Sequence, residues 1–199
     1  METPETIREF WFGGNADDGE VARAKERLWW GKDAAADEQI RRRFRPVVEA
    51  AARRELEPWS STADGRLALI LLADQMPRAI WRGTPRAFAY DPLALSWCRA
   101  GLAEGIHQAL RPIERVFFFL PLEHSESVDD QEAAVALFED LAASVPREHG
   151  ATFEGFLDFA VRHRDIIARC GRFPHRNRIL CRESTAVEIG FLELPGSSF

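Results

Sequence analysis

The sequence predicts an all-α protein in which about nine helices pack as antiparallel hairpins. Three observations support this fold class. Stretches in which apolar and polar residues alternate, as β-strands require, are absent. Alanine, leucine, arginine and glutamate, which favour helices, are abundant along the whole chain. Capping residues, glycines and prolines divide the chain into helix-length segments with short connections, as in stacked helical hairpins.

The first half of the chain divides at its capping residues. A glycine pair ends the first helix, and Asp33 can cap the third. Pro46 either interrupts that third helix or restarts it. We expect helices at 4–12, 16–30, 34–44 with a helical continuation to 54, and 62–73. The last of these is apolar on nearly all sides after Arg66, which predicts a central, buried helix.

The second half carries similar signals. Asp91, followed by a proline, indicates the N-cap of a helix over 91–104. Pro112 opens a helix over 112–120, and Pro121 either kinks this helix or starts a new turn. Ser127 resembles the start of a capping box with Asp in the place of Glu, and Thr185 starts a complete one. The remaining helices are expected at 129–143, 153–169 and 185–194, with a short helical turn from 174.

The bulk composition limits the class of protein. A chain of 199 residues fits one helical domain, residues 1–199, which can fold without a metal or a disulfide. The net charge of −6 argues against nucleic-acid binding, because phosphate contacts need a basic surface. Three cysteines without a CxxC pair, and an N-terminus unlike a signal peptide, predict a cytoplasmic protein. The apolar run 116–122 is too short to cross a membrane.

Two late segments carry opposite charge. Residues 162–182 hold seven arginines, two histidines and one acid, whereas residues 116–146 hold seven acids and neither lysine nor arginine. Because each segment adjoins an apolar run, we expect the two to pair where late helices meet. Binding of phosphate or RNA by the arginines is the alternative, and it is the less economical one.

Polar residues cluster at the ends of three apolar runs, near 74–78, 123–126 and 163–177. An acid at a helix C-terminus faces the negative end of the helix dipole and therefore needs a cationic partner. These groups either form salt bridges that close the core helices, or line a shared pocket for a small anionic ligand or a peptide. The candidate ligand-binding residues are Asp74, Gln75, Arg78, Arg82, His124, Glu126, Asp130, His163, Arg164, Arg172, His175, Arg176 and Asn177.

His124 and His163 are the candidate acid–base groups. Each lies near an acid in sequence, Glu123 or Asp165, and histidine titrates near neutral pH. Sequence adjacency does not orient a ring, because consecutive side chains on a helix point about 100° apart. A histidine bonded to a backbone carbonyl at a helix end is the structural alternative for both.

Motifs for metals, nucleophiles and nucleotides are missing from the sequence. The single E-x-x-H over 104–107 lacks the second copy that a di-iron bundle needs. There is no nucleophile elbow and no glycine-rich phosphate loop. Cys170 lies among arginines that could lower its pKa, but a small buried thiol is the simpler interpretation. We therefore expect no metal and no cofactor.

Five strings of the sequence form a recognisable set. They are FWFGG at 10–14, WWGKD at 29–33, DQMPRAIWRGTPRAFAYDPLAL at 74–95, ERVFFFLPLEHSESVDDQE at 114–132 and HRDIIARCGRFPHRNRIL at 163–180. The set resembles the bacterial family catalogued as domain of unknown function 924, over essentially the whole chain. The resemblance implies a helical fold similar to tetratricopeptide-type hairpins, and it implies no established activity.

The candidate residues all fall within these strings, together with Glu123, Ser125, Gln131 and Asp165. The sequence departs from the family pattern at Met76, Cys170 and Cys181. The family pattern therefore gives no support to a catalytic cysteine.

Three functions follow from these patterns. The first is a binding module, with a tetratricopeptide-like superhelix and a polar His/Arg/carboxylate pocket for a small anion or a peptide. The second is an acid–base, hydrolase-like enzyme that uses His124 or His163 with an arginine as anion clamp. The third is a purely structural network, with the function on another surface. An open cavity at the polar groups would favour the first two, and full pairing without a cavity would favour the third.

Overall fold

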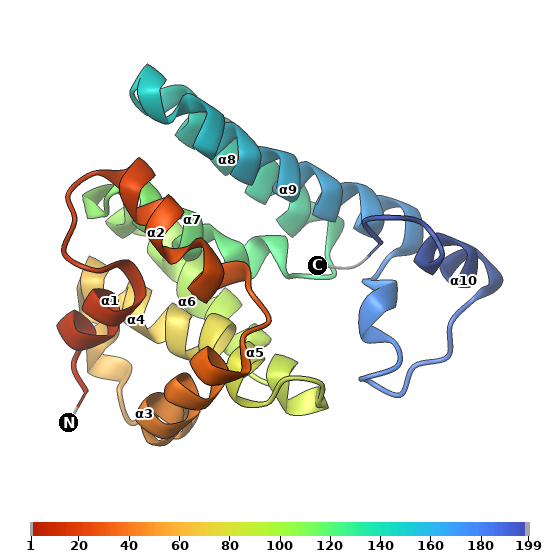
Figure 1. The fold of residues 1–199 in the computed structure, drawn as a ribbon, viewed down its shortest axis with the longest axis horizontal. Coiled ribbons are helices and arrows are strands. Elements are labelled where there is room, and N and C mark those ends of the chain that lie inside the picture. The colour runs from red at the N-terminus through yellow and green to blue at the C-terminus, as the bar shows by residue number, and fades with distance from the viewer. Residues whose placement is uncertain (1, 198–199) are drawn as a thin grey trace.

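The computed structural model describes residues 2–197, and the regular structure of these residues is entirely helical (Figure 1). The all-α prediction is thereby confirmed, whereas the tetratricopeptide-like superhelix and the single domain stay predictions. The α-helices are α1 (Pro4–Phe12), α2 (Asp18–Trp30), α3 (Ala34–Ala52), α4 (Ala63–Ile70), α5 (Met76–Ile80), α6 (Asp91–Ala103), α7 (Pro112–Glu123), α8 (Val128–Ser144), α9 (Gly150–Cys170) and α10 (Ala186–Leu192). Within residues 2–197, no helix has the length and hydropathy needed to cross a bilayer.

The central helix is longer than expected and contains a π-helical segment. α4, the π-helical segment Leu71–Gln75 and α5 follow one another without a break over residues 63–80. Pro77 lacks an N–H, and its ring crowds the preceding turn, which a wider π turn accommodates. Thr62 caps the start by accepting from the Gly65 N–H at 3.1 Å. The predicted central burial is confirmed, because every residue from 65 to 77 is buried.

Local expectations at four positions needed correction. α3 continues through Pro46, and α7 continues through Pro121 to residue 123, because packing outweighs one lost backbone hydrogen bond in each. Asp91 is not an N-cap: Tyr90 holds that position, and Asp91 is the first residue of α6. Ser127 makes no capping hydrogen bond with its side chain. By contrast, the capping box at Thr185 is present.

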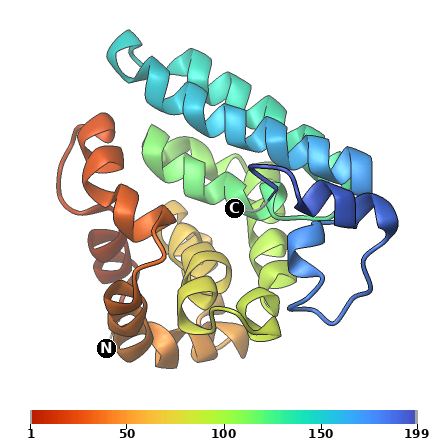
Figure 2. The same cartoon turned by 45° about the vertical axis from the view of Figure 1, so that its right-hand side comes forward.

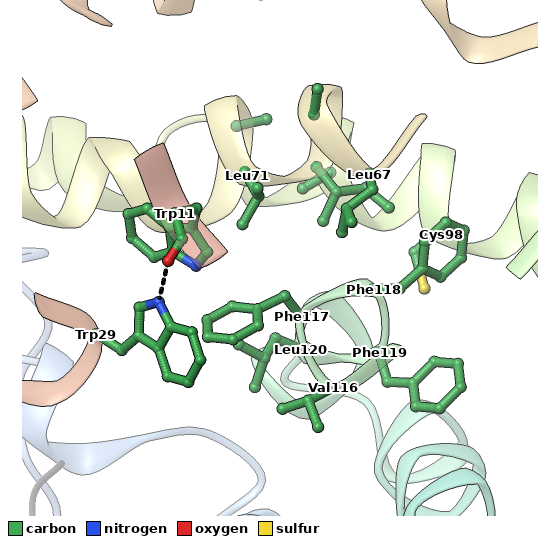
Figure 3. Close-up of a cluster of buried hydrophobic side chains, with 14 of the residues drawn as sticks. Trp11, Trp29, Leu67, Leu71, Cys98, Val116, Phe117, Phe118, Phe119 and Leu120 are labelled. Atoms are coloured by element: carbon green, nitrogen blue, oxygen red, sulfur yellow. Dashed lines mark hydrogen bonds between the residues drawn. The ribbon is translucent and has the colours of Figure 1, made fainter. Parts of the chain in front are cut away.

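An aromatic cluster fills the centre of the core, around α7 (Figure 3). The Phe117 ring lies 4.7 Å from the Trp29 ring and 5.7 Å from the Trp11 ring, measured between centroids. The indole Nε1 of Trp29 donates to the carbonyl oxygen of Trp11 at 3.0 Å. This bond satisfies the polar atom of a large buried side chain and ties α2 to α1.

The last third of the chain lies against the rest of the bundle. α8 and α9 form a long antiparallel pair that packs on α7 (Figures 1 and 2). Gly171, with a φ of 68°, ends α9 as the sequence predicted. The chain then enters a 3-10 turn, Pro174–Arg176, before α10. This turn brings Arg176 beside the carboxyl end of α7, where His124 lies.

Candidate functional site

A buried carboxylate, Asp74, forms the centre of a polar cluster. It lies in the π-helical segment, a type of turn that is frequent at functional sites, and its side chain is 0% exposed. Its oxygens lie 2.8 and 3.0 Å from Nδ1 of His124, and Nε2 of Gln75 donates to it at 2.5 Å. Nη1 of Arg78 lies 3.4 Å away and also donates to the Asp74 backbone carbonyl.

The charge state of Asp74 follows from these neighbours. Burial raises the pKa of Asp74, but the charge of Arg78 and the interactions with His124 outweigh burial and hold that pKa below its ordinary value. Asp74 is therefore ionised at neutral pH, and it is the acceptor in its hydrogen bond with His124.

His124 ends α7, and its ring is held by Asp74. Burial lowers the pKa of His124, so the imidazole is neutral at neutral pH. Because Nδ1 donates its proton to Asp74, the lone pair is on Nε2. Nε2 forms no hydrogen bond with any residue of 2–197, and the side chain is 13% exposed. The arrangement leaves one nitrogen of an oriented imidazole available to another molecule.

Two arginines converge on Asp91. Nη1 and Nη2 of Arg78 donate to its two oxygens, each at 3.0 Å, and Nη1 of Arg176 lies 3.6 Å from Oδ2. Arg176 also donates from Nη1 to the His124 backbone carbonyl at 3.1 Å. Its guanidinium lies over the rings of Phe173 and Phe88, at 4.4 and 4.9 Å from the ring centroids.

Arg176 is a buried cation with incomplete compensation. Its Nε is buried without a hydrogen-bond partner among residues 2–197. Burial, and next the like charge of Arg78, lower the pKa of Arg176 to about 10. The guanidinium stays charged at neutral pH, and its surroundings favour the arrival of a further negative charge.

His163 has a different environment from His124. Its Nδ1 lies 2.8 Å from the Phe159 backbone carbonyl and 3.0 Å from a carboxylate oxygen of Glu123. These are the contacts expected of a histidine that ties α9 to the end of α7. His163 therefore fits the structural alternative, although its ring lies near His124, with 6.2 Å between centroids.

Glu126 and Asn177 hold the segment after α9 in place. Glu126 accepts from Arg182 at 2.6 and 2.9 Å and from the Phe173 backbone N–H at 2.8 Å. Asn177 accepts from Nε of Arg182 at 2.9 Å. Both candidate residues thus fix the turn that carries Arg176, and their polar groups are occupied in doing so.

Several other candidates lie in separate pairs. Arg82 pairs with Asp37, and Arg172 pairs with Glu188. Asp130 accepts from Arg99 and Ser125, and Arg164 pairs with Asp165 and Glu132. His175 is half-buried, and burial, followed by the charge of Arg176, lowers its pKa to about 3. The structure therefore gathers Asp74, Gln75, Arg78, His124 and Arg176 with His163 adjacent, and it leaves Arg82, Asp130, Arg164 and Arg172 outside.

The expected pairing of the two charged segments is confirmed in two places. Arg182 pairs with Glu126, and Arg164 reaches Glu132 at 3.4 Å. Elsewhere the expectation was wrong, because Arg162 pairs with Asp158, one turn earlier on α9, and Arg172 pairs with Glu188 of α10. Arg176 instead turns inward to the Asp74 cluster.

Sequence reasoning missed Asp91 as a member of the cluster. An Asp–Pro step resembles a helix start, and that interpretation concealed its role as the shared partner of two arginines. It also missed the π turn and the ring of Phe88. The signal available in the sequence was an aspartate that closely follows several arginines within the string 74–95.

Metal and cysteine chemistry find no support in this region. No three His, Cys, Asp or Glu side chains of residues 2–197 gather so as to hold a metal ion. Burial, and next the charge of Glu188, raise the pKa of Cys170, and they outweigh the lowering by the nearby Arg169 and Arg172. Shallow hollows on α1 and α3, lined among others by Phe10 and by Gln39, share no residue with the cluster.

Comparison with known proteins places the chain in a family. No curated protein matches it. A solved structure of a protein of unknown function from Agrobacterium tumefaciens is similar, with 40% sequence identity, a TM-score of 0.80 and 96% of each chain covered. The model of a family described as bacterial protein of unknown function (DUF924) matches residues 7–196. The chain therefore belongs to the DUF924 family.

Proposed function

We propose that this protein binds a small anionic ligand at the cluster of Arg78, His124 and Arg176. The observation that carries the proposal is the incomplete compensation of Arg176. Its Nε is buried without a partner, and the nearest carboxylate oxygen to its guanidinium in the cluster lies 3.6 Å away. A buried cation that lacks full pairing is costly, so an anion from solution that reaches it gains free energy.

The cluster extends to the molecular surface. The side chains of Arg78, Asp91 and His124 are 20%, 18% and 13% exposed. Nε2 of His124 can donate to or accept from the ligand, depending on its protonation. A group the size of a carboxylate or phosphate, either free or at the end of a peptide, fits this description better than a large ligand.

Replacement of Arg176 by methionine tests the proposal. Acetate, citrate and inorganic phosphate are added to the wild type, and the thermal midpoint is measured. A ligand at a hundred times its Kd stabilises the folded state by about 2.7 kcal/mol. We expect at least one anion to raise the midpoint of the wild type, and Arg176→Met to lose that rise.

Arg162→Met is the matched control, because Arg162 is an exposed arginine paired with Asp158 on α9. It removes the same charge and should keep the response to the anion. If no anion stabilises the wild type more than Arg176→Met, the cluster is a structural tie between helices and the binding proposal is wrong.

A second candidate function is an acid–base enzyme, and the Asp74–His124 pair favours it. A carboxylate that holds Nδ1 of a neutral imidazole, with Nε2 available, is the arrangement of a general base. Nδ1 of His124 contacts the carboxylate of Asp74, whereas Nδ1 of His163 is shared between the Phe159 backbone carbonyl, at 2.8 Å, and the carboxylate of Glu123, at 3.0 Å.

Diethylpyrocarbonate, which acylates neutral imidazole nitrogens, tests this second candidate. His149 is an internal reference, because its side chain is 16% exposed, close to the 13% of His124. We expect His124 to be modified at least as fast as His149, as measured by mass spectrometry of peptides. Asp74→Asn should slow the modification, because an amide can donate to Nδ1 and move the proton to Nε2. An unchanged rate in Asp74→Asn would exclude the orienting role of Asp74.

A further inference from the structure

We propose that the carboxylate of Asp91 occupies the position that a carboxylate of the ligand takes, so that Asp91 is a built-in competitor for the site. The inference rests on the proposed anion site. It adds the chemical class of the ligand, a carboxylate, and names the residue that sets its affinity.

The seat, by which we mean the space between the guanidiniums of Arg78 and Arg176, has a shape that suits a carboxylate. Arg78 presents two parallel N–H donors, each 3.0 Å from one oxygen of Asp91. Such a fork can hold two oxygens of a carboxylate or of a phosphate. Both guanidiniums lie over the ring of Phe88, with 5.6 and 4.9 Å to its centroid. The carboxylate of Asp91 already fits between the two guanidiniums, so the seat has the shape of a carboxylate.

Asp91 can leave the seat at a low cost in free energy. Its carboxylate bonds to no backbone N–H among residues 2–197, so its removal breaks no helix cap. The side chain is 18% exposed, and a carboxylate at the first residue of α6 remains favoured by the helix dipole when it turns to solvent. Asp74 differs, because it is 0% exposed and also bonds to Gln75 and His124.

The charges around Asp91 do not fully stabilise its ionised form. The groups that face Asp91 are Arg78 on α5, Arg176 on the 3-10 turn, Asp74 on the π-helical segment and His124 at the end of α7. Burial raises the pKa of Asp91, and the two arginines only partly offset it. The ionised form of Asp91 is therefore less stable than two cationic neighbours alone would make it.

Calorimetric titration with dichloroacetate, a carboxylate that stays ionised in mild acid, tests the proposal. We expect Asp91→Asn to bind dichloroacetate about tenfold more tightly than the wild type, because the competitor is gone and the binding-competent state is fully populated. The gain for inorganic phosphate should be smaller. Equal gains for both anions would overturn the preference for a carboxylate, and unchanged or weaker binding by Asp91→Asn would overturn the role of Asp91.

Asp37→Asn is the matched control, because Asp37 forms an equivalent two-oxygen pair with Arg82, at 2.5 and 2.7 Å, outside the cluster. It should bind dichloroacetate as the wild type does. If the Arg176→Met variant loses anion binding while Asp91→Asn leaves it unchanged, the anion site stands and the competitor role fails. If only Asp91→Asn binds, the seat exists but the wild type is not a binder. If neither the wild type nor Asp91→Asn binds, both proposals fail.

A measurement on the wild type avoids dependence on the folding of Asp91→Asn. As pH falls from about 7 towards 4, Asp91 takes up a proton earlier than an ordinary aspartate, because its pKa is raised. Protonation frees the arginines, so dichloroacetate should bind more tightly at the lower pH. His124 also gains charge as pH falls, at a lower pH than an ordinary histidine because its pKa is lowered. A pH dependence that persists in folded Asp91→Asn would assign the effect to His124 and overturn the proposal.

Discussion

Asp74→Ala should lower the free energy of unfolding by about 3–5 kcal/mol, the range for removal of one member of a buried ion pair. The side chain is 0% exposed and contacts His124, Gln75 and Arg78. Alanine would leave the imidazole of His124 without its acceptor and would remove one of the two carboxylates that compensate the charge of Arg78. The measurement is urea denaturation, in which the midpoint should fall while the slope stays the same.

Asp37→Ala provides the comparison for Asp74→Ala. Asp37 also pairs with an arginine, Arg82, but that guanidinium is 41% exposed, so the pair should contribute no more than about 1 kcal/mol. If Asp74→Ala costs as little as Asp37→Ala, water reaches the cluster and the description of Asp74 as its buried centre is wrong.

Because the pKa of Asp74 is lowered, its contribution to the free energy of unfolding should depend on pH. The pKa of Asp74 is lowered in the folded protein, so the unfolded chain binds a proton at higher pH than the folded one does. The stability that Asp74 contributes is fully present above its ordinary pKa of 3.8 and is lost as pH falls through the lower folded value. The destabilisation caused by Asp74→Ala should therefore be constant near neutral pH and shrink only in strong acid.

Phe117→Ala should also be severely destabilising, by about 3–5 kcal/mol. The ring is 0% exposed and contacts the rings of Phe12 and Trp30. It also contacts the rings of Trp11 and Trp29 (Figure 3). Its removal leaves a cavity at the junction of α1, α2 and α7, which these rigid neighbours cannot fill by small shifts. Tryptophan fluorescence during denaturation reports the loss directly, because three of the contacting rings are indoles.

Trp30→Ala is the control for Phe117→Ala, since Trp30 belongs to the same cluster but is 46% exposed. Trp30→Ala should lower the free energy of unfolding clearly less than Phe117→Ala does, because much of the Trp30 surface is already in water. Equal costs for the two variants would mean that the cluster is held by Trp30 rather than by the α7 ring at its centre.

The members of the polar cluster were predicted far better than their contacts. Asp74, Gln75, Arg78, His124 and Arg176 were all candidates, because each follows an apolar run at a helix end. Sequence position could not separate them from Arg82 and Arg172, which occupy similar places yet pair with Asp37 and Glu188. A charged side chain next to a core helix has several partners within reach, and only packing of the elements selects one.

The sequence by itself determined the helical class, most helix boundaries and the segments in which charged groups concentrate. These features depend on residues within about one turn of each other, such as Thr185 and its capping box, so neighbouring residues contain the information. The tertiary structure alone decided that His124 meets Asp74, fifty positions earlier, and that Arg176 meets the end of α7. It also decided that Asp91, the first residue of α6, pairs with two arginines instead of capping the helix. Such contacts are set by helix packing around the aromatic core, a property of the whole chain that no local pattern encodes.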